Sequence, residues 1–216
     1  MQESHSYTAS ISDVLLPELH ALYPKPITLL TYNNPFELLV KVMLSAQCSD
    51  AQVNKIAPRL FEAYPDARAL SRARVADVAR IIRPLGYFNT KSNYCIQIAQ
   101  SVLAQGGVPD TLEALCAMPG VGKKSASVIL YVVFKKPALI VDRHVARVAS
   151  RLGLAPGDAS IPKVETSMAL CCKREDWGSI SMLLNYHGRF VCKARTPLCQ
   201  SCSLNTHCAF FNNTDS

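Results

Sequence analysis

The chain has 216 residues, of which 49% are hydrophobic and 18% are charged, and this composition excludes an intrinsically disordered protein. Its formal net charge of +7 favours a polyanionic partner, although charge alone does not separate nucleic acid from an acidic membrane surface. Residues 1–10 lack the apolar core of a signal peptide, and the longest apolar run, residues 126–134, is too short to span a bilayer. We therefore expect a soluble, intracellular protein with no membrane partner, whose nine cysteines are reduced or metal-bound.

The first predicted helices can be located by their capping residues. Asn34 can cap a helix over residues 35–46, whose first residue is a proline, as that position tolerates. This segment is apolar on nearly all sides, so we expect a central, buried helix. Ser49 can cap the next helix, over residues 50–64, and Pro58 inside it should kink or end it.

The rest of the chain also has the pattern of helices separated by turns. Asp110 is expected to cap a short helix that ends near Met118, residues 138–141 to form a short extended link, and residues 212–216 to form a frayed tail. The other predicted helices cover residues 67–70, 75–82, 90–105, 123–134, 142–152, 162–172 and 176–191. No segment alternates with the period of a strand, so the sequence predicts an all-α protein.

Four cysteines near the C-terminus follow a C-x6-C-x2-C-x5-C pattern: Cys192, Cys199, Cys202 and Cys208. Four thiolates within 17 residues can close around one metal centre without a long loop. The spacing suits either zinc or an iron–sulfur cluster, since both accept four cysteine ligands. Lys193 and Arg195 lie between these cysteines and could contact phosphate, although solvated surface charge is the simpler interpretation.

Residues 115–126, with the sequence LCAMPGVGKKSA, predict two helices joined by a turn. Gly120 and Gly122 permit close backbone approach, and the N–H groups that start the second helix favour an anion such as a DNA phosphate, beside Lys123. A plain helix–helix turn would have the same pattern. The surrounding charge supports the phosphate site, because residues 120–152 hold seven basic residues and one acidic residue.

Lys124 lies in the first turn of that second helix. The positive end of the helix dipole and the neighbouring Lys123 both disfavour a second ammonium charge, and an uncharged lysine amine is a nucleophile. Asp142 follows 18 residues later, and its carboxylate could take the proton of that amine or stabilise a cationic sugar. The simpler alternatives are a surface charge for Lys124 and a helix cap for Asp142.

Together these segments resemble the endonuclease III family of helix-hairpin-helix DNA glycosylases. The motifs that carry the resemblance occur in that family's order: LSAQCSD (44–50), MPGVGKKSA (118–126), VDRHVARV (141–148), HGRFVC (187–192) and the four-cysteine loop. The resemblance implies two helical domains with the active-site cleft between them. One is a six-helix barrel with the hairpin over residues 26–137, and the other is a cluster domain built from residues 1–25 and 138–216. The resemblance also implies a structural 4Fe–4S cluster rather than zinc.

The same resemblance implies a bifunctional DNA glycosylase and AP lyase of base excision repair. Such an enzyme would act as a monomer on double-stranded DNA that holds an oxidised pyrimidine, such as thymine glycol, or an abasic site, in the cytoplasm of a bacterium at its nucleoid. Lys124 would displace the base and form a Schiff base, Asp142 would activate Lys124, and β-elimination would cut the strand. Gln47 matches the glutamine with which the family fills the gap in the duplex.

The chain departs from the family's pattern at three positions. Tyr87 replaces a leucine wedge and could intercalate by stacking, Cys116 replaces a glutamate, and Arg143 replaces a threonine and could add a phosphate contact. Two rival functions are left open. A mismatch-specific glycosylase would share the fold but lack the hairpin lysine, and a non-catalytic DNA-binding protein would need neither Lys124 nor Asp142.

Overall fold

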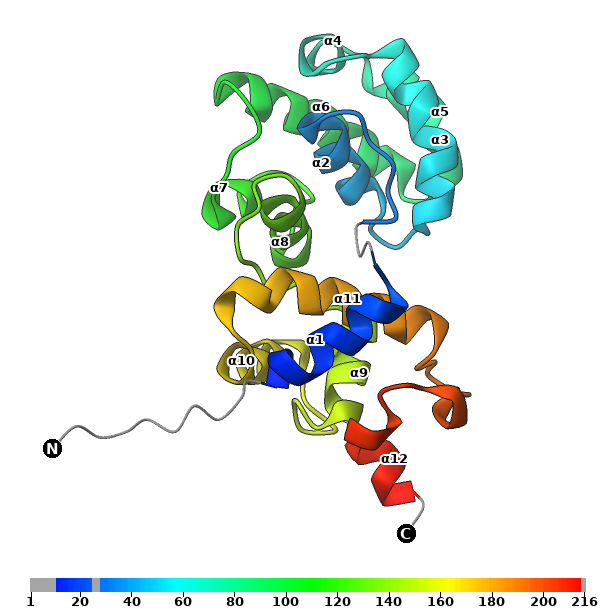
Figure 1. Ribbon diagram of the computed structural model, residues 1–216. Coiled ribbons are helices and arrows are strands. Elements are labelled where there is room, and N and C mark those ends of the chain that lie inside the picture. Colours follow the sequence, from blue (N-terminus) through cyan, green and yellow to red (C-terminus); the bar gives the residue numbers. More distant parts are fainter. Residues whose placement is uncertain (1–10, 25–27, 215–216) are drawn as a thin grey trace, which may run out of the picture. The chain divides into compact units, whose positions relative to one another are not determined.

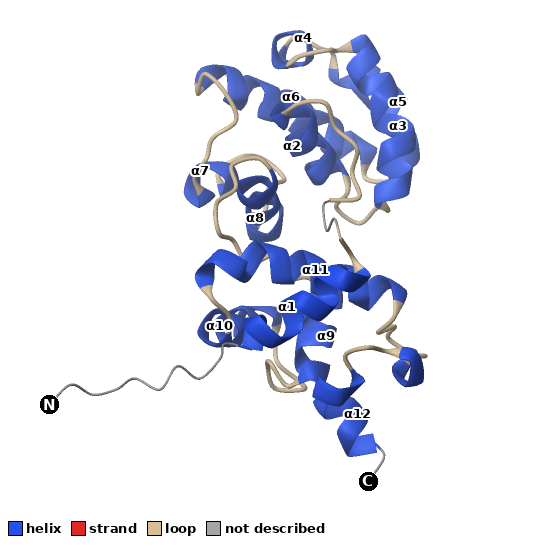
Figure 2. Ribbon diagram, in the orientation of Figure 1, coloured by secondary structure: helices blue, strands red, loops and turns tan. Residues whose placement is uncertain are grey.

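The computed structural model describes residues 11–24 and 28–214, and Figure 1 shows it as a ribbon. The regular elements of these residues are helices, and Figure 2 shows no strand among them. The all-α class predicted from the sequence is therefore confirmed. No helix in the described segments is both long and apolar enough to cross a membrane.

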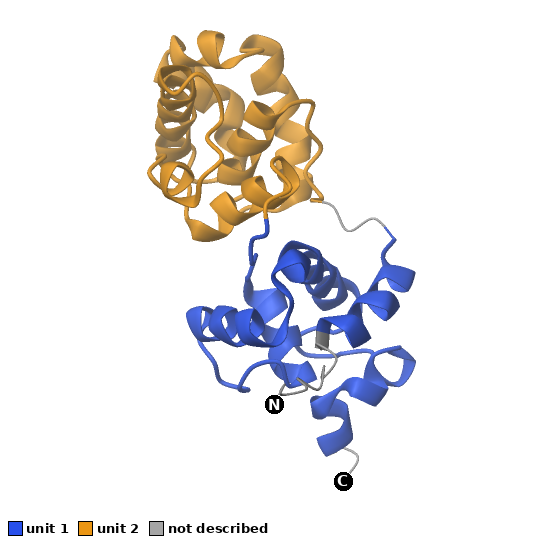
Figure 3. Cartoon of the chain, turned by 60° about the vertical axis from the view of Figure 1, so that its left-hand side comes forward, with its two compact units in different colours: residues 1–27, 137–216 blue, residues 28–136 orange. Residues whose placement is uncertain are grey.

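The chain divides into two compact units, which Figure 3 draws in different colours. Unit 1 comprises residues 1–27 and 137–216, so both ends of the chain contribute to it. Unit 2 comprises residues 28–136. Unit 2 holds the glycine turn and Lys124, whereas unit 1 holds Asp142 and the four-cysteine loop.

Unit 2 is built from short and medium-length helices. In chain order they are α2 (Pro35–Leu44), α3 (Asp50–Ala63), α4 (Ala67–Ser71), α5 (Val75–Ile82), the 3-10 turn η1 (Arg83–Leu85), α6 (Phe88–Ala104), α7 (Leu112–Cys116) and α8 (Lys123–Val132). All nine residues from Phe36 to Leu44 are buried, so α2 is the central helix that the sequence predicts. The predicted caps are also confirmed: Asn34 Oδ1 accepts from the N–H of Glu37 at 2.9 Å, and Ser49 Oγ accepts from Gln52 at 3.2 Å.

Pro58 does not end α3, contrary to one of the two outcomes expected from the sequence. The helix continues to Ala63 with the proline exposed on its outer side. Ile56 and Leu60, on either side of the proline in sequence, are both buried. Continuing the helix through Pro58 costs one backbone hydrogen bond, whereas ending it there would expose the apolar side chains of this face to water. The helix continues because burial of these side chains outweighs the lost hydrogen bond.

The predicted cap of α7 is wrong by one residue. Thr111, not Asp110, is the N-cap, and its Oγ1 accepts from the N–H of Ala114 at 3.3 Å. Asp110 instead accepts from the Lys136 ammonium at 2.6 Å. The expected frayed tail is also corrected, because residues 212–214 belong to α12 (Ala209–Thr214), and residues 215–216 lie outside the described part of the chain.

Unit 1 packs helices from both ends of the chain around one apolar core. Its helices are α1 (Ile11–Leu22), α9 (Arg143–Leu152), α10 (Ile161–Cys171), η2 (Arg174–Asp176), α11 (Trp177–Phe190), η3 (Cys199–Ser201), η4 (Asn205–His207) and α12. Leu19 of α1, Val145 of α9 and Leu183 of α11 are fully buried in this core. Gly188 lets α11 lie close to α9, because a Cβ there would stand 3.0 Å from the Cβ of His144.

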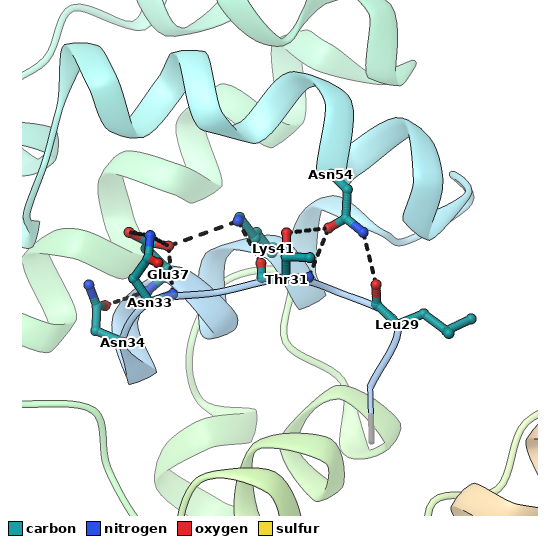
Figure 4. A network of polar contacts seen from close by, with 7 residues as sticks. All are labelled: Leu29, Thr31, Asn33, Asn34, Glu37, Lys41 and Asn54. Atoms are coloured by element: carbon teal, nitrogen blue, oxygen red, sulfur yellow. Dashed lines mark hydrogen bonds and ion pairs between the residues drawn. The ribbon is translucent and has the colours of Figure 1, made fainter. Parts of the chain in front are cut away.

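A polar network fastens the segment before α2 to the helices of unit 2 (Figure 4), and its charged members Lys41 and Glu37 are buried. Lys41 Nζ donates to the carbonyl of Thr31 at 2.6 Å and lies 3.9 Å from Oε2 of Glu37, and both charged side chains are under 8% exposed. Burial lowers the pKa of Lys41, and Glu37 acts in the opposite direction. Asn54 of α3 donates to the carbonyl of Leu29 at 2.8 Å and accepts from the N–H of Thr31 at 3.0 Å.

Candidate active site and metal-binding pocket

The turn between α7 and α8 requires the first of its two glycines. Gly120 has a φ of +74°, and a Cβ there would lie 2.6 Å from Cδ2 of Tyr94 and 3.0 Å from Cγ of Met43. Gly122 is the exposed N-cap of α8, and no side chain of the described residues caps that helix. Its first N–H groups therefore form an exposed helix N-terminus, which suits an anion such as a phosphate.

Lys123 and Lys124 form the start of α8, and both side chains are exposed. Lys124 makes no hydrogen bond or ion pair with any residue in the ranges 11–24 and 28–214. Its amine is accordingly accessible, which a nucleophile requires and which a surface charge also satisfies.

Gln47 and Tyr87 line one open pocket of about 220 Å³ in unit 2, together with Tyr94 and Gly120. Both residues have left-handed backbone conformations, with φ of 56° at Gln47 and 46° at Tyr87. Such conformations cost about 1–3 kcal/mol in non-glycine residues and persist only where the surrounding structure enforces them, often at functional sites. Three DNA-contact residues predicted from separate segments of the sequence therefore meet at one surface, and the Tyr87 side chain is 67% exposed there.

The segment that presents Tyr87 is held from within unit 2 by Lys91. The Nζ of this buried lysine donates to the carbonyl of Leu85 at 3.0 Å, and burial lowers its pKa. Thr90, Lys91 and Tyr94 also line the pocket, and the sequence analysis did not single them out. The signal that would have found them is their spacing, because residues 90, 91 and 94 share one face of α6.

Asp142 is the N-cap of α9, so the simpler interpretation of this residue is correct as far as one oxygen is concerned. Its Oδ1 accepts from the N–H groups of His144 at 2.9 Å and Val145 at 3.0 Å. Its Oδ2 accepts from Nδ2 of Asn185 on α11 at 2.7 Å. The sequence analysis missed Asn185, because nothing local marks a partner that lies 43 residues away.

The basic residues near α9 fall into two groups. Three that the sequence analysis assigned to DNA contact are exposed: Arg143, Lys193 and Arg195. The other group holds the cysteine loop, since Arg147 Nη2 donates to the carbonyl of Gly188 at 2.7 Å and to that of Cys192 at 3.0 Å. Arg151 donates to the carbonyls of Lys193 at 2.8 Å and Ala194 at 3.0 Å. Arg147 and Arg151, two of the seven basic residues in the range 120–152, therefore stabilise unit 1 through these hydrogen bonds.

The four cysteines of the C-terminal pattern line one pocket in unit 1, among apolar side chains such as Val148 and Leu204. Burial raises the pKa of the Cys202 thiol, and the charges of the other three thiols raise it further. A cationic centre would relieve both effects, so this donor set fits a thiophilic metal. Within the described residues, no three Cys, His, Asp or Glu side chains form a site for a single ion. The four thiols nevertheless line the same pocket.

Comparison with known proteins gives matches over nearly the whole chain. The endonuclease III of Synechocystis sp. is 38% identical over 193 residues, which are 88% of each chain. The endonuclease III of Escherichia coli K12 is 36% identical over 203 residues, covering 93% of this chain and 96% of that protein. A solved structure of a trapped endonuclease III–DNA covalent intermediate matches with a TM-score of 0.86 and 34% identity, over 94% of this chain and 97% of that one.

The family comparison agrees with these relatives. Residues 40–174 match the model of the HhH-GPD superfamily of base excision DNA repair proteins, and this span covers more than half of the chain. It includes the glycine turn, Lys124 and Asp142. The chain belongs to the HhH-GPD superfamily of base excision DNA repair proteins and, within it, to the endonuclease III family of DNA glycosylases with AP-lyase activity.

Proposed function

We propose that this enzyme removes oxidised pyrimidines, such as thymine glycol, from double-stranded DNA and cleaves the resulting abasic site by β-elimination. The observation that carries the proposal is Lys124, an accessible amine in the first turn of α8, directly after the turn that holds Gly120 and Gly122. One solved structure with 34% sequence identity to this chain is that of a trapped endonuclease III–DNA covalent intermediate. A lysine amine can form a covalent intermediate of this kind.

The proposed reaction begins when Lys124 Nζ attacks C1′ of the damaged nucleotide. The C1′–N bond breaks, the base leaves with the bonding pair, and ring opening gives a Schiff base between Nζ and C1′. Loss of a proton from C2′ then expels the 3′ phosphate, and water later releases the lysine. Asp142 takes a proton from Lys124 and balances positive charge that develops on the sugar. Both residues act on the same nucleotide in this proposal.

DNA binding requires that the damaged nucleotide leave the base stack, because its C1′ is unreachable inside a duplex. We assign Gln47 and Tyr87 to the gap that remains, and their shared pocket and strained backbones support that assignment. The phosphate backbone would be held by the turn at Gly120, Gly122 and Lys123, and by the exposed Arg143, Lys193 and Arg195. These contacts position the duplex without reading its sequence.

A 4Fe–4S cluster is the cofactor that the four-cysteine pocket supports best, with Cys192, Cys199, Cys202 and Cys208 as ligands. Four cysteine ligands also suit a single zinc ion, and the membership of the endonuclease III family favours the cluster. When bound, the cluster supplies folding free energy to the cysteine loop, and no step of the reaction passes through it. We further propose that the enzyme acts as a monomer on the nucleoid in the bacterial cytoplasm.

Borohydride trapping on a duplex with thymine glycol tests the proposed function against both rivals. We expect a covalent protein–DNA adduct that is lost in Lys124→Ala and retained in the control Lys55→Ala, which changes an exposed lysine of α3. A mismatch-specific glycosylase would release its base without an adduct, and a non-catalytic DNA-binding protein would bind the duplex and release no base. Absence of an adduct from a folded, cluster-loaded protein would therefore overturn the proposal.

A further inference from the structure

The side-chain amide of Asn185 joins Asp142 to Arg189 inside unit 1. Asn185 Nδ2 donates to Oδ2 of Asp142 at 2.7 Å, and Arg189 Nε donates to Oδ1 of Asn185 at 2.9 Å. The guanidinium of Arg189 can only donate, so it requires the amide oxygen on its side. The orientation of the amide is therefore determined, and its N–H group must face the carboxylate.

The packing of α11 against α9 places this amide. Asn185 and Arg189 are four residues apart on α11, so their side chains share one face. Gly188 lies between them and permits the close approach to His144 at the start of α9. This approach allows an amide side chain on one helix to reach the capping carboxylate of the other.

The hydrogen bonds also distinguish the two oxygens of Asp142. An ionised carboxylate has about four acceptor positions, two on each oxygen. Two backbone N–H groups fill both acceptor positions of Oδ1. Oδ2 accepts from one donor among the described residues, the amide of Asn185. The remaining acceptor position is therefore on Oδ2, the oxygen whose direction Asn185 sets.

We propose that Asn185, supported by Arg189, is a positioning residue that holds Oδ2 of Asp142 as the oxygen that meets the lysine amine and the sugar. The inference rests on the proposed role of Asp142 in the reaction. Asn185 touches neither substrate nor nucleophile in this proposal, and it acts only through the carboxylate.

Two variants of Asn185 separate positioning from a merely structural role. Asn185→Leu removes the donor at similar volume, and Asn185→Asp replaces it with a carboxyl group that donates only when protonated. Base release would be followed in single turnover on the thymine glycol duplex at saturating enzyme. DNA affinity would be measured by anisotropy on a duplex with a tetrahydrofuran abasic analogue, and the melting temperature of each variant would be recorded. Ser179→Ala is the matched control, because it removes one hydrogen bond, to His20, from the same helix.

We expect both Asn185 variants to slow base release by about 10- to 100-fold at pH 7.5, as loss of a hydrogen bond to a charged group predicts. DNA affinity should stay within about threefold of wild type, and Ser179→Ala should have the wild-type rate. Two carboxyl groups this close share a proton, so the introduced group becomes a donor again as the pH falls. The rate of Asn185→Asp relative to wild type should therefore rise towards pH 5.5, whereas the relative rate of Asn185→Leu should stay flat. The adjoining Arg143 and His144 are unchanged in every variant, whereas Arg189 contacts residue 185 itself and favours the ionised form of the introduced carboxyl group.

Asp142→Asn distinguishes failure of the inference from failure of the proposed function. If Asp142→Asn releases base at the wild-type rate, the role of Asp142 is wrong and the inference fails with it. If Asp142→Asn is slow while both Asn185 variants match wild type, only the inference is overturned. It is also overturned if the Asn185 variants are slow together with a large loss of DNA affinity or melting temperature, and without recovery of Asn185→Asp at low pH.

Discussion

Each carboxylate oxygen of Asp142 has a separate task in this account. Oδ1 caps the N-terminus of α9 by accepting hydrogen bonds from two backbone N–H groups, and Asn185 orients Oδ2. Asparagine is also a good N-cap, so Asp142→Asn removes the charge while it keeps the cap. A single residue therefore joins the stability of a helix to the proposed chemistry, and the two contributions can be separated by the choice of substitution.

The two glycines of the turn make a matched pair for a residue-scale prediction. Gly120→Ala should lower the stability of the protein by at least about 2 kcal/mol, because the new Cβ meets Tyr94 at 2.6 Å in a left-handed conformation. Gly122→Ala should be tolerated, because its backbone is extended, with φ of −84°, and its Cβ would meet no atom within 4 Å. Urea unfolding midpoints of the two variants provide the test, and equal loss in both would contradict this reading of the turn.

At the scale of the helix, the network around α2 carries a prediction of stability. Lys41→Ala should destabilise the protein by roughly 3–5 kcal/mol, because the buried Glu37 carboxylate loses its countercharge and keeps only its hydrogen bonds from Asn33, and the carbonyl of Thr31 loses its donor. Lys55→Ala is the control, since an exposed lysine of the adjacent α3 should change stability by no more than about 0.5 kcal/mol. Thermal unfolding followed by circular dichroism measures both. A wild-type melting temperature for Lys41→Ala would show that the network does not hold this segment.

How far the sequence predicted these elements depended on how local the signals were. The caps Asn34, Ser49 and Asp142 act on N–H groups two or three residues away, and all three were predicted correctly. The cap of α7 was misplaced because Asp110 and Thr111 are both good caps, and the choice depends on Lys136, 26 residues away. The partner of Asp142 could not be found at all, since Asn185 reaches it only after α11 packs on α9.

The residues proposed to contact DNA show the same limit. The motifs identified Gln47, Tyr87 and Gly120 as separate candidates, whereas the pocket that unites them depends on the fold of unit 2. The left-handed conformations of Gln47 and Tyr87 have no local sequence signal, because neither residue is a glycine or an asparagine. The sequence therefore indicated what the residues could do, and tertiary packing determined which of them act together.

At the scale of the whole molecule, the metal site should stabilise unit 1, and its loss should leave unit 2 folded. The cysteine loop packs against the core of unit 1, while the buried helix α2 belongs to unit 2. Cys199→Ser should therefore abolish the brown colour and the absorbance near ~400 nm expected of an iron–sulfur protein. It should also reduce amide-exchange protection in residues 192–214 and preserve protection in residues 36–44.

The exposed Cys116 supplies the control for that experiment. Cys116→Ser should keep the full iron content, because this cysteine lies outside the four-cysteine pocket. Iron retained at wild-type stoichiometry in Cys199→Ser, or zinc found in place of iron in the wild-type protein, would contradict the assignment of the pocket.

The central claim is that the amine of Lys124 forms the bond to DNA. Mass spectrometry of tryptic peptides from the borohydride-reduced, nuclease-digested adduct locates that bond directly. We expect a deoxyribose remnant on Lys124 and a missed tryptic cleavage after it. A remnant on Lys123, on the N-terminal amine or on any other lysine would contradict the account.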